Sequence, residues 1–325
     1  MTEVGGGMGG GQPSPIAGFD QKIHEEVDPA QCLQVGGETI IPARYQLVRP
    51  KDAAGQPRDQ TLDAVRNMRY AASLGLDHLQ LAGPHEGRCV IVGGSPQVRD
   101  HLDHIRRLAE QPGTAVYALN WTHTWLIQNG IVPAGCLFFE IDAEPDSILQ
   151  STHPDTTYYI CSHCHRKTFD ELVGRKRVLW HSRPNSDGEE VAFAELFPGQ
   201  LQLGGGIGTL LRTVSLGMAL GYRKFDLFGV DSSFPEGGRT HVDGYETVMD
   251  AAQDGMDVWL RDEGTGELHH FRTVGYLALQ SEEFKQYCLT NHMMYFMRVH
   301  GTGLLPTLHR ITWPRQYDPA YTGEW

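Results

Sequence analysis

The hydrophobic and polar positions of the chain alternate between short apolar runs and longer amphipathic stretches. Six runs have the length and the β-branched or aromatic content of buried strands, at 88–92, 115–119, 136–141, 157–160, 177–180 and 225–230. Stretches with apolar residues at helical spacing lie at 62–72, 98–108 and 207–218. Because strands alternate with helices, the pattern predicts an α/β protein with a mainly parallel, doubly wound sheet.

A polar residue follows most of the predicted strands at the point where the apolar run ends. These residues are Asn120, Asp142, Ser162, His181 and Asp231. The carboxyl ends of parallel strands share one edge of a sheet, and that edge is where open α/β folds bind ligands. The pattern therefore predicts that these side chains share one ligand-binding edge.

Two glycine-rich turns lie between a predicted strand and a predicted helix. The first is Gly93-Gly94-Ser95-Pro96, in which Ser95 suits an N-cap and Pro96 suits the first helical position. The second runs from Gly204 to Thr209. A glycine turn that opens a helix directs backbone N–H groups at a phosphate. The G-x-G-x-x-G fingerprint is absent, which favours a generic nucleotide loop over a nicotinamide site; turns that only allow close packing remain the alternative.

The remaining segments divide the chain into four predicted parts. Residues 1–15 are a glycine-rich, flexible arm. Residues 16–80 are an N-terminal extension and helix, 81–300 the nucleotide-binding domain, and 301–325 an aromatic, proline-bearing tail. Within the domain, runs at 256–260 and 268–271 flank a glycine turn and predict a small β-hairpin, and 281–297 is predicted to be helical.

Composition and charge restrict the class of protein. The chain of 325 residues has a net charge of −13, which disfavours an extensive nucleic-acid interface. It contains no apolar run of the ~20 residues that a membrane span needs. The N-terminus lacks a signal-peptide pattern, and the six cysteines are scattered as reduced thiols would be. These features predict a cytoplasmic protein.

Two chemical motifs have alternative interpretations. Cys161-Ser162-His163-Cys164-His165 has the spelling C-x-x-C-H, but a zinc site needs a second ligand pair of similar spacing, and none is found in the sequence. We therefore predict no metal site there, and expect Ser162 to lie on the ligand-binding edge. His241 follows Asp231 by ten residues and is able to exchange a proton near neutral pH, although a lone loop histidine is usually a surface residue.

Several short motifs occur in an order that resembles a known superfamily. They are Val90-Ile91-Val92-Gly93-Gly94-Ser95-Pro96, Ala118-Leu119-Asn120, Ile131-Val132-Pro133 with Asp142, and Ala219-Leu220-Gly221-Tyr222 with Leu227-Phe228-Gly229-Val230-Asp231. The set resembles the MptE-like 6-hydroxymethylpterin diphosphokinases and the motility-associated-factor glycosyltransferases. More distantly, it is similar to bacterial sialyltransferases that use CMP-activated sugars. The resemblance covers roughly residues 60–290.

This resemblance implies a Rossmann-like core that binds a nucleotide-activated donor, either CMP-sugar-like or ATP, and transfers part of it to a hydroxyl acceptor. It assigns the donor phosphates to Gly93, Gly94 and Ser95, and the nucleotide or leaving group to Asn120 and Asp142. It also assigns the base or phosphate to Gly205, Gly206 and Thr209, ribose or a metal to Asp231, and acid/base chemistry to His241. Two positions depart from the pattern: the serine of the first loop precedes the proline, and Gly206 replaces a common serine or threonine.

The sequence thus supports three hypotheses about function. The first is a nucleotide-sugar-dependent glycosyltransferase. The second is an ATP-dependent pyrophosphokinase of the 6-hydroxymethylpterin diphosphokinase type, with Mg²⁺ as a cofactor. The third is a catalytically silent relative that docks into a larger assembly through its glycine-rich arm and aromatic tail, with a partner or a second copy of itself bound through the arm.

Overall fold

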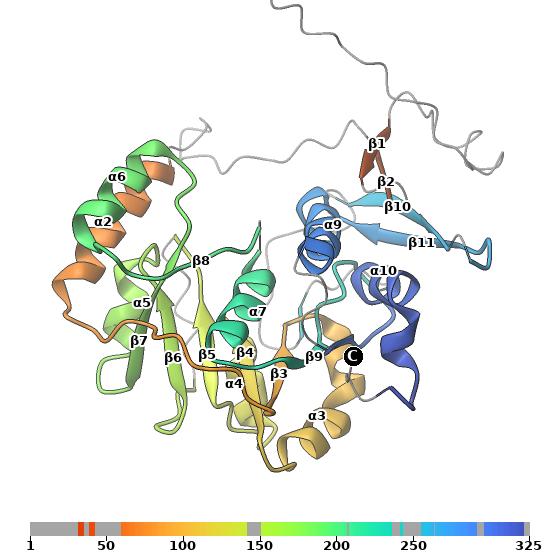
Figure 1. The fold of residues 1–325 in the computed structure, drawn as a ribbon, viewed down its shortest axis with the longest axis horizontal. Coiled ribbons are helices and arrows are strands. Elements are labelled where there is room, and N and C mark those ends of the chain that lie inside the picture. Colours follow the sequence, from red (N-terminus) through yellow and green to blue (C-terminus); the bar gives the residue numbers. More distant parts are fainter. Residues whose placement is uncertain are drawn as a thin grey trace, which may run out of the picture.

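The structure, a computed structural model, describes residues 32–35, 39–42, 60–141, 151–206, 208–235, 241–242, 255–262, 264–290 and 296–321 (Figure 1). Within these ranges, eight strands form one sheet in the order β12-β9-β3-β4-β5-β6-β7-β8, and every neighbouring pair is parallel. The strands are β3 (Arg88–Val92), β4 (Thr114–Leu119), β5 (Gly135–Phe138), β6 (Thr157–Cys161), β7 (Lys176–Ser182), β8 (Gln202–Leu203), β9 (Lys224–Phe228) and β12 (Phe296–Val299). The predicted parallel, Rossmann-like α/β sheet is confirmed.

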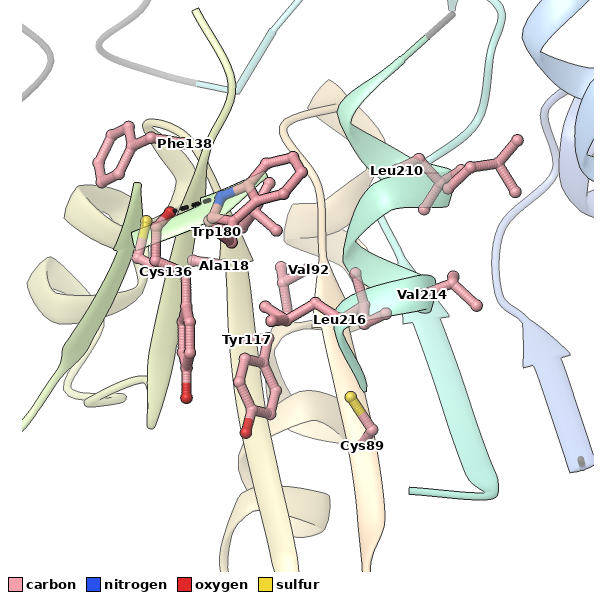
Figure 2. Close-up of a cluster of buried hydrophobic side chains, with 14 of the residues drawn as sticks. Cys89, Val92, Tyr117, Ala118, Cys136, Phe138, Trp180, Leu210, Val214 and Leu216 are labelled. Atoms are coloured by element: carbon pink, nitrogen blue, oxygen red, sulfur yellow. Dashed lines mark hydrogen bonds between the residues drawn. The ribbon is translucent and has the colours of Figure 1, made fainter. Parts of the chain in front are cut away.

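Helices flank this sheet. They are α2 (Gln60–Ser73), the 3₁₀ helix η2 (Pro96–His101), α3 (Leu102–Ala109), α4 (Thr122–Gln128), α5 (Arg166–Glu171), α6 (Asp187–Leu196) and α7 (Thr209–Ala219). The apolar face of α7 packs on the central strands, where Val214 and Leu216 join Val92 and Tyr117 in one buried cluster (Figure 2). Trp180 of β7 is completely buried there, and its indole N–H donates to the carbonyl of Tyr159 at 3.2 Å. The amphipathic pattern of the sequence therefore forms the core.

The direction of chain growth reverses next to β3. From β3 to β8 each new strand is added on one side, and α7 then returns the chain to β9 on the other side of β3. The carboxyl ends of β3 and β9 therefore form a topological switch point, the place where such folds leave a crevice for a ligand.

A second, smaller layer stands over this edge of the sheet (Figure 1). Strands β1 (Cys32–Val35), β2 (Thr39–Pro42), β10 (Met256–Arg261) and β11 (Leu268–Thr273) form an antiparallel sheet. The predicted C-terminal hairpin is β10 and β11, which pair Val258 with Phe271. Helices α9 (Gly275–Thr290) and α10 (Leu304–Thr312), followed by the 3₁₀ helix η3 (Pro314–Tyr317), complete the chain, and both α helices contribute to the apolar cluster under β10.

Two predicted segments near the C-terminus differ from the structure. The helix predicted over 281–297 begins at Gly275 and ends at Thr290, and Phe296–Val299 is instead the edge strand β12, in which Met297 and Val299 are fully buried. The segment after residue 301 contains α10, because Leu304, Leu305 and Leu308 are buried against the rest of the protein. A short apolar run is compatible with a strand or a helix, and tertiary packing decides between them.

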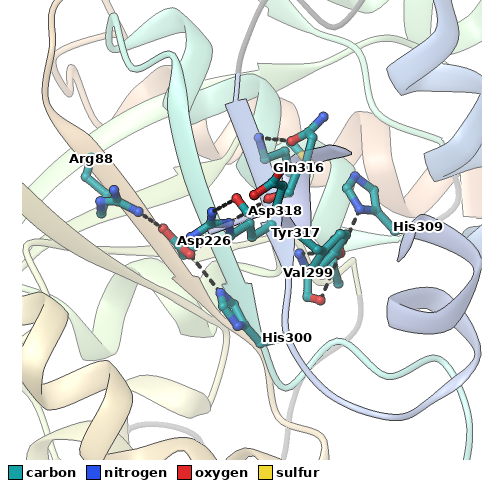
Figure 3. A network of polar contacts seen from close by, with 10 residues as sticks. Arg88, Asp226, Val299, His300, His309, Gln316, Tyr317 and Asp318 are labelled. Atoms are coloured by element: carbon teal, nitrogen blue, oxygen red, sulfur yellow. Dashed lines mark hydrogen bonds and ion pairs between the residues drawn. The ribbon is translucent and has the colours of Figure 1, made fainter. Parts of the chain in front are cut away.

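A buried carboxylate connects β12 to the middle of the sheet (Figure 3). Asp226 of β9 accepts a hydrogen bond from Arg88 of β3 and lies 2.7 Å from His300 Nε2, just beyond β12. Burial acts to raise the pKa of Asp226, but the hydrogen bond from His300 and the charge of Arg88 outweigh it, so the pKa is lowered. The ionised carboxylate therefore stabilises the packing of three neighbouring strands.

We expect Asp226→Asn to lower the free energy of unfolding by about 3 kcal/mol, because it removes the charge that both partners face in a buried position. The chain offers a matched control in Asp257, which also pairs with a histidine and an arginine, His270 and Arg272, but whose side chain is 37% exposed. Asp257→Asn should cost less than about 1 kcal/mol. Urea unfolding of the two variants measures the difference, and equal losses would contradict the structural role of Asp226.

Candidate active site

A pocket of about 1120 Å³ lies at the carboxyl edge of the parallel sheet. Its walls come from the segments that follow β3, β4, β5, β7, β8 and β9, and α9 contributes Tyr276, Leu277, Gln280 and Glu283. The volume exceeds the upper end, about 1000 Å³, of typical small-molecule pockets. Of the residues that the sequence predicts for a site, the pocket includes Gly93, Gly94, Ser95, Asn120, Gly205, Gly206, Thr209, Asp231 and His241.

The loops after β3 and β9 are in direct backbone contact. Gly93 N donates to Phe228 O at 2.8 Å, and Ser95 N donates to Gly229 O at 3.0 Å. A Cβ atom on Gly93 would lie 2.5 Å from Gly229 O, and one on Gly229 would lie 2.3 Å from Gly93 O. Both positions therefore require glycine, and Gly229 also has a positive φ of 64°.

Asp231 is a buried carboxylate that connects the loops at this contact. Its carboxylate accepts a hydrogen bond from the Ser95 hydroxyl and one from Gly303 N at 3.4 Å. Asp231 is 1% exposed, and burial raises its pKa, although the Ser95 hydrogen bond acts in the opposite direction. In the described protein Asp231 thus joins the first glycine loop to the loop before α10.

His241 lies against the first glycine loop. Val242 N donates to Gly94 O at 2.8 Å, and a Cβ atom on Gly94 would be 3.3 Å from the imidazole Cδ2 of His241. Burial lowers the pKa of His241 to about 4. The imidazole is therefore neutral near pH 7, beside the backbone that the sequence assigns to a phosphate.

The second glycine loop surrounds a buried cation that the sequence did not indicate. Arg212, in the first turn of α7, is 5% exposed and donates to Ser182 Oγ at 3.2 Å and to Gly208 O at 2.9 Å. Its guanidinium lies 3.9 Å from the centre of the Phe139 ring. A Cβ atom on Gly205 would lie 2.6 Å from Arg212 N, so glycine is needed for this approach. The pocket also includes the exposed Arg183 after β7.

Helix α9 approaches the same loop from the small layer. A Cβ atom on Gly206 would lie 2.3 Å from Glu283 Oε2, and one on Gly208 would lie 2.0 Å from Gln280 Oε1. Gln280 Nε2 also donates to Ser232 Oγ at 3.1 Å, on the loop after β9. The smaller layer therefore completes the pocket, and Gly206, where the related pattern has a hydroxyl residue, leaves room for Glu283.

Asn120 and Glu140 form a polar pair at the ends of β4 and β5. Asn120 Nδ2 donates to Glu140 Oε1 at 2.6 Å. Asn120 has a φ of 44°, a left-handed conformation that is uncommon outside glycine. The sequence predicted Asn120 from its position after a strand, but it gave no indication that Glu140 belongs to the site.

The structure places two predicted edge residues away from the pocket. Ser162 is completely buried, and its N–H donates to Trp180 O at 2.9 Å. His181 is 1% exposed and packs against His78 and Phe197. Two helices cover this end of the sheet: Asn67 of α2 donates to Ile141 O and His163 O at 3.0 and 2.9 Å, and Phe193 of α6 packs on the His181 ring. Asp142 lies outside the described residues.

The residues that the structure describes contain neither a metal-binding cluster nor a membrane-spanning helix. No three histidine, cysteine, aspartate or glutamate side chains gather there in a way that could hold a metal ion, and this includes the C-x-x-C-H segment. None of the helices described has both the length and the apolar character needed to cross a membrane.

Comparison with known proteins shows similarity at the level of the fold. No protein-family model and no curated protein sequence matches the chain. Among solved structures, the chain is similar to a MAf glycosyltransferase from Magnetospirillum magneticum AMB-1, with a TM-score of 0.55 and 17% identity over 75% of this chain. The matched region spans only 37% of that protein. A mammalian sialyltransferase in complex with Gal-beta-1-3GalNAc-ortho-nitrophenol gives a TM-score of 0.35 at 10% identity, covering 75% of this chain and 80% of that one.

Buried neutral histidines make the stability of this edge sensitive to acid. Burial lowers the pKa of His241 and of His163 to about 4, and that of His181 to about 3, from 6.5. The unfolded chain therefore binds protons at a pH at which the folded protein does not. We expect the free energy of unfolding to fall as the pH decreases from 6.5 to 4. The decrease is about 1.4 kcal/mol per pH unit for each histidine that is protonated in the unfolded chain and neutral in the folded protein.

Denaturant unfolding at a series of pH values measures this slope. His181→Phe should reduce the slope, because the phenyl ring keeps the aromatic contacts with Phe193 and Phe197 but does not titrate. Stability that is constant between pH 6.5 and 4 would contradict the neutral, buried state of these side chains.

Proposed function

We propose that the protein is a glycosyltransferase that binds a nucleotide-activated sugar in this pocket and transfers the sugar to a hydroxyl group. The observation that supports it best is the meeting of two glycine-rich loops, the start of α7 and a buried arginine in one pocket at the switch point of a Rossmann-like sheet. The similarity of the fold to that of a MAf glycosyltransferase favours this reaction class over others that the same fold supports.

The donor phosphate belongs, in this proposal, between the loop Gly93–Ser95 and the start of α7. Backbone N–H groups at the start of α7 and the guanidinium of Arg212 would stabilise the negative charge that develops on the leaving phosphate. These N–H groups come from α7 because Gly93 N and Ser95 N already donate to Phe228 O and Gly229 O. The neutral imidazole of His241, which adjoins Gly94, would donate a hydrogen bond to the same group. A bound phosphate would also raise the pKa of His241, since an adjacent anion favours the protonated form.

The remaining predicted residues keep their assignments as proposals. Asn120 and Asp142 would contact the nucleotide or the leaving group, and Gly205, Gly206 and Thr209 the base or a phosphate. For Asp231 we propose an indirect role. Its contacts with Ser95 and Gly303 would fix the shape of the first glycine loop, and that loop, not the Asp231 carboxylate, would contact the ribose or a metal.

Binding of nucleotides to the wild-type protein tests the proposal. Calorimetry with CMP, CDP, UDP and ATP, each with and without Mg²⁺, should show selective binding of a nucleotide that activates sugars. Binding of ATP alone would favour the pyrophosphokinase, and no binding of any nucleotide would favour a silent binding module.

Arg212→Gln should weaken binding of the selected nucleotide about ten- to hundredfold, because it removes a charge-assisted hydrogen bond to the phosphate. Arg66→Gln, on the surface of α2 in a pair with Asp63, is the matched control and should bind as the wild type does. Thermal unfolding of both variants checks that the fold is retained. Equal affinity in the Arg212 variant and the wild type would exclude Arg212 from the phosphate site.

A further inference from the structure

The described lining of the pocket contains three carboxylates, those of Glu140, Asp231 and Glu283. Asp231 is nearly inaccessible and holds Ser95 and Gly303. Glu283 lies on the second glycine loop, against Gly206. Glu140 differs from both: it lies two residues after the end of β5, is partly exposed, and accepts a hydrogen bond from a residue in a left-handed conformation.

The conformation of Asn120 is fixed from several directions. Its N–H donates to Leu137 O at 3.0 Å, and its carbonyl accepts from His123 Nδ1 at 3.0 Å and from Cys136 Sγ at 3.3 Å. A left-handed non-glycine residue costs free energy, and such residues persist where the surrounding structure holds them, often at functional sites. The result is an amide that presents Nδ2 to Glu140.

The amide oxygen of Asn120, Oδ1, is a buried hydrogen-bond acceptor that the described residues leave unsatisfied. A buried acceptor without a donor is unfavourable, and an O–H or N–H of a ligand in the pocket would satisfy it. Asn120 thus contacts Glu140 through Nδ2 and leaves Oδ1 for an O–H or N–H of the donor nucleotide that the pocket is proposed to bind.

The C-x-x-C-H segment, residues 161–165, has no role in the proposed donor binding, but it holds the main chain of Glu140 in place. His165 N donates to Glu140 O at 2.9 Å, and Glu140 N donates to Cys164 Sγ at 3.4 Å. Cys164 is fully buried, and burial raises its pKa well above the usual value, so the sulfur is a neutral acceptor. The segment therefore holds the main chain of Glu140 on both sides of its Cα atom.

We propose that Glu140 is the general base of the transfer reaction and that Asn120 is the positioning residue that orients it. This inference rests on the proposed function. Glu140 takes the proton of the acceptor hydroxyl as the acceptor oxygen bonds to the anomeric carbon. The bond from that carbon to the donor phosphate oxygen breaks, and the nucleotide leaves with the electron pair. The protonated carboxyl then returns its proton to water.

In this proposal the leaving phosphate and the acceptor hydroxyl contact different side chains. Near Gly94, the uncharged His241 faces the leaving phosphate, while Glu140 at the end of β5 faces the acceptor. Tyr276 of α9 lies near Glu140: burial raises the pKa of its phenol, and the Glu140 charge raises it further, so the phenol stays protonated. A carboxylate that activates an attacking hydroxyl group is established chemistry in sugar transfer to water.

Glu140→Gln tests the base directly. CMP-N-acetylneuraminate and UDP-N-acetylglucosamine serve as donor probes, lactose as the acceptor, and release of CMP or UDP as the readout. We expect kcat to fall about 100-fold or more, the contribution of a general base, while the affinity for CMP or UDP stays unchanged. Glu140→Asp keeps the carboxylate and should recover part of the rate. Glu86→Gln, on an exposed side chain paired with Lys224, is the control with wild-type turnover.

Asn120→Asp distinguishes a positioning residue from a merely structural one. Aspartate tolerates the left-handed conformation, so the backbone is preserved. It places a second carboxylate within hydrogen-bond distance of Glu140, and two such groups share one proton, which raises the pKa of one of them. The acidic limb of the pH profile of kcat should therefore move to higher pH than in the wild type.

The outcomes separate the two proposals. Release of nucleotide by the wild type, with Glu140→Gln equally active or the acidic limb of Asn120→Asp unmoved, would overturn the assignment of Glu140 alone. No release by the wild type from either donor would overturn the glycosyl transfer reaction and the base together. Loss of CMP or UDP binding in Glu140→Gln would place Glu140 in donor binding and contradict its role as a base.

Discussion

The close approach of two backbones at the end of β3 and β9 is the constraint on which the rest of the pocket depends. Gly93 and Gly229 each leave no space for a Cβ atom on the other. Since strand order reverses here, the loops diverge after this contact, one toward η2 and the other toward the small layer. Asp231 then fixes both by holding Ser95 and Gly303. A pocket of this size can be preformed only because its floor is determined by backbone hydrogen bonds and a buried carboxylate, neither of which needs a ligand.

The second glycine loop meets a different requirement, because it lies between two layers. Gly205 accommodates Arg212 from its own helix, whereas Gly206 and Gly208 accommodate Glu283 and Gln280 from α9. The loop thus brings a cation and a carboxylate into the same pocket from opposite sides. Burial acts to lower the pKa of Arg212, while the Glu283 carboxylate of α9 acts to raise it. The small layer is therefore part of the electrostatics of the site as well as its cover.

Much of this arrangement could be predicted from local sequence. Asn120 and Asp231 follow apolar runs, and Gly93 and Gly205 precede helices, so strand ends and helix starts alone were enough to bring them to one edge. Arg212 was missed because a polar residue inside an amphipathic helix normally faces solvent. Glu283 and Gln280 depend on where α9 packs, which is a long-range property. Ser162 and His181 follow strands as Asn120 does, but α2 and α6 cover their end of the sheet, and no local pattern predicts that cover.

The same burial that hides these polar groups also separates their chemistry. His241 and Glu140 both line the pocket, yet His241 is uncharged near neutral pH because burial opposes its protonation. The pairing of Asn120 with Glu140 is of a different kind, because the amide N–H donates a hydrogen bond to the carboxylate. Pairs of titratable groups whose environments favour different charge states are how one site supports both a proton acceptor and a hydrogen-bond donor at a single pH. In this fold the division follows from the topology: β3 delivers the glycine loop to the imidazole, and β4 and β5 deliver the amide to the carboxylate.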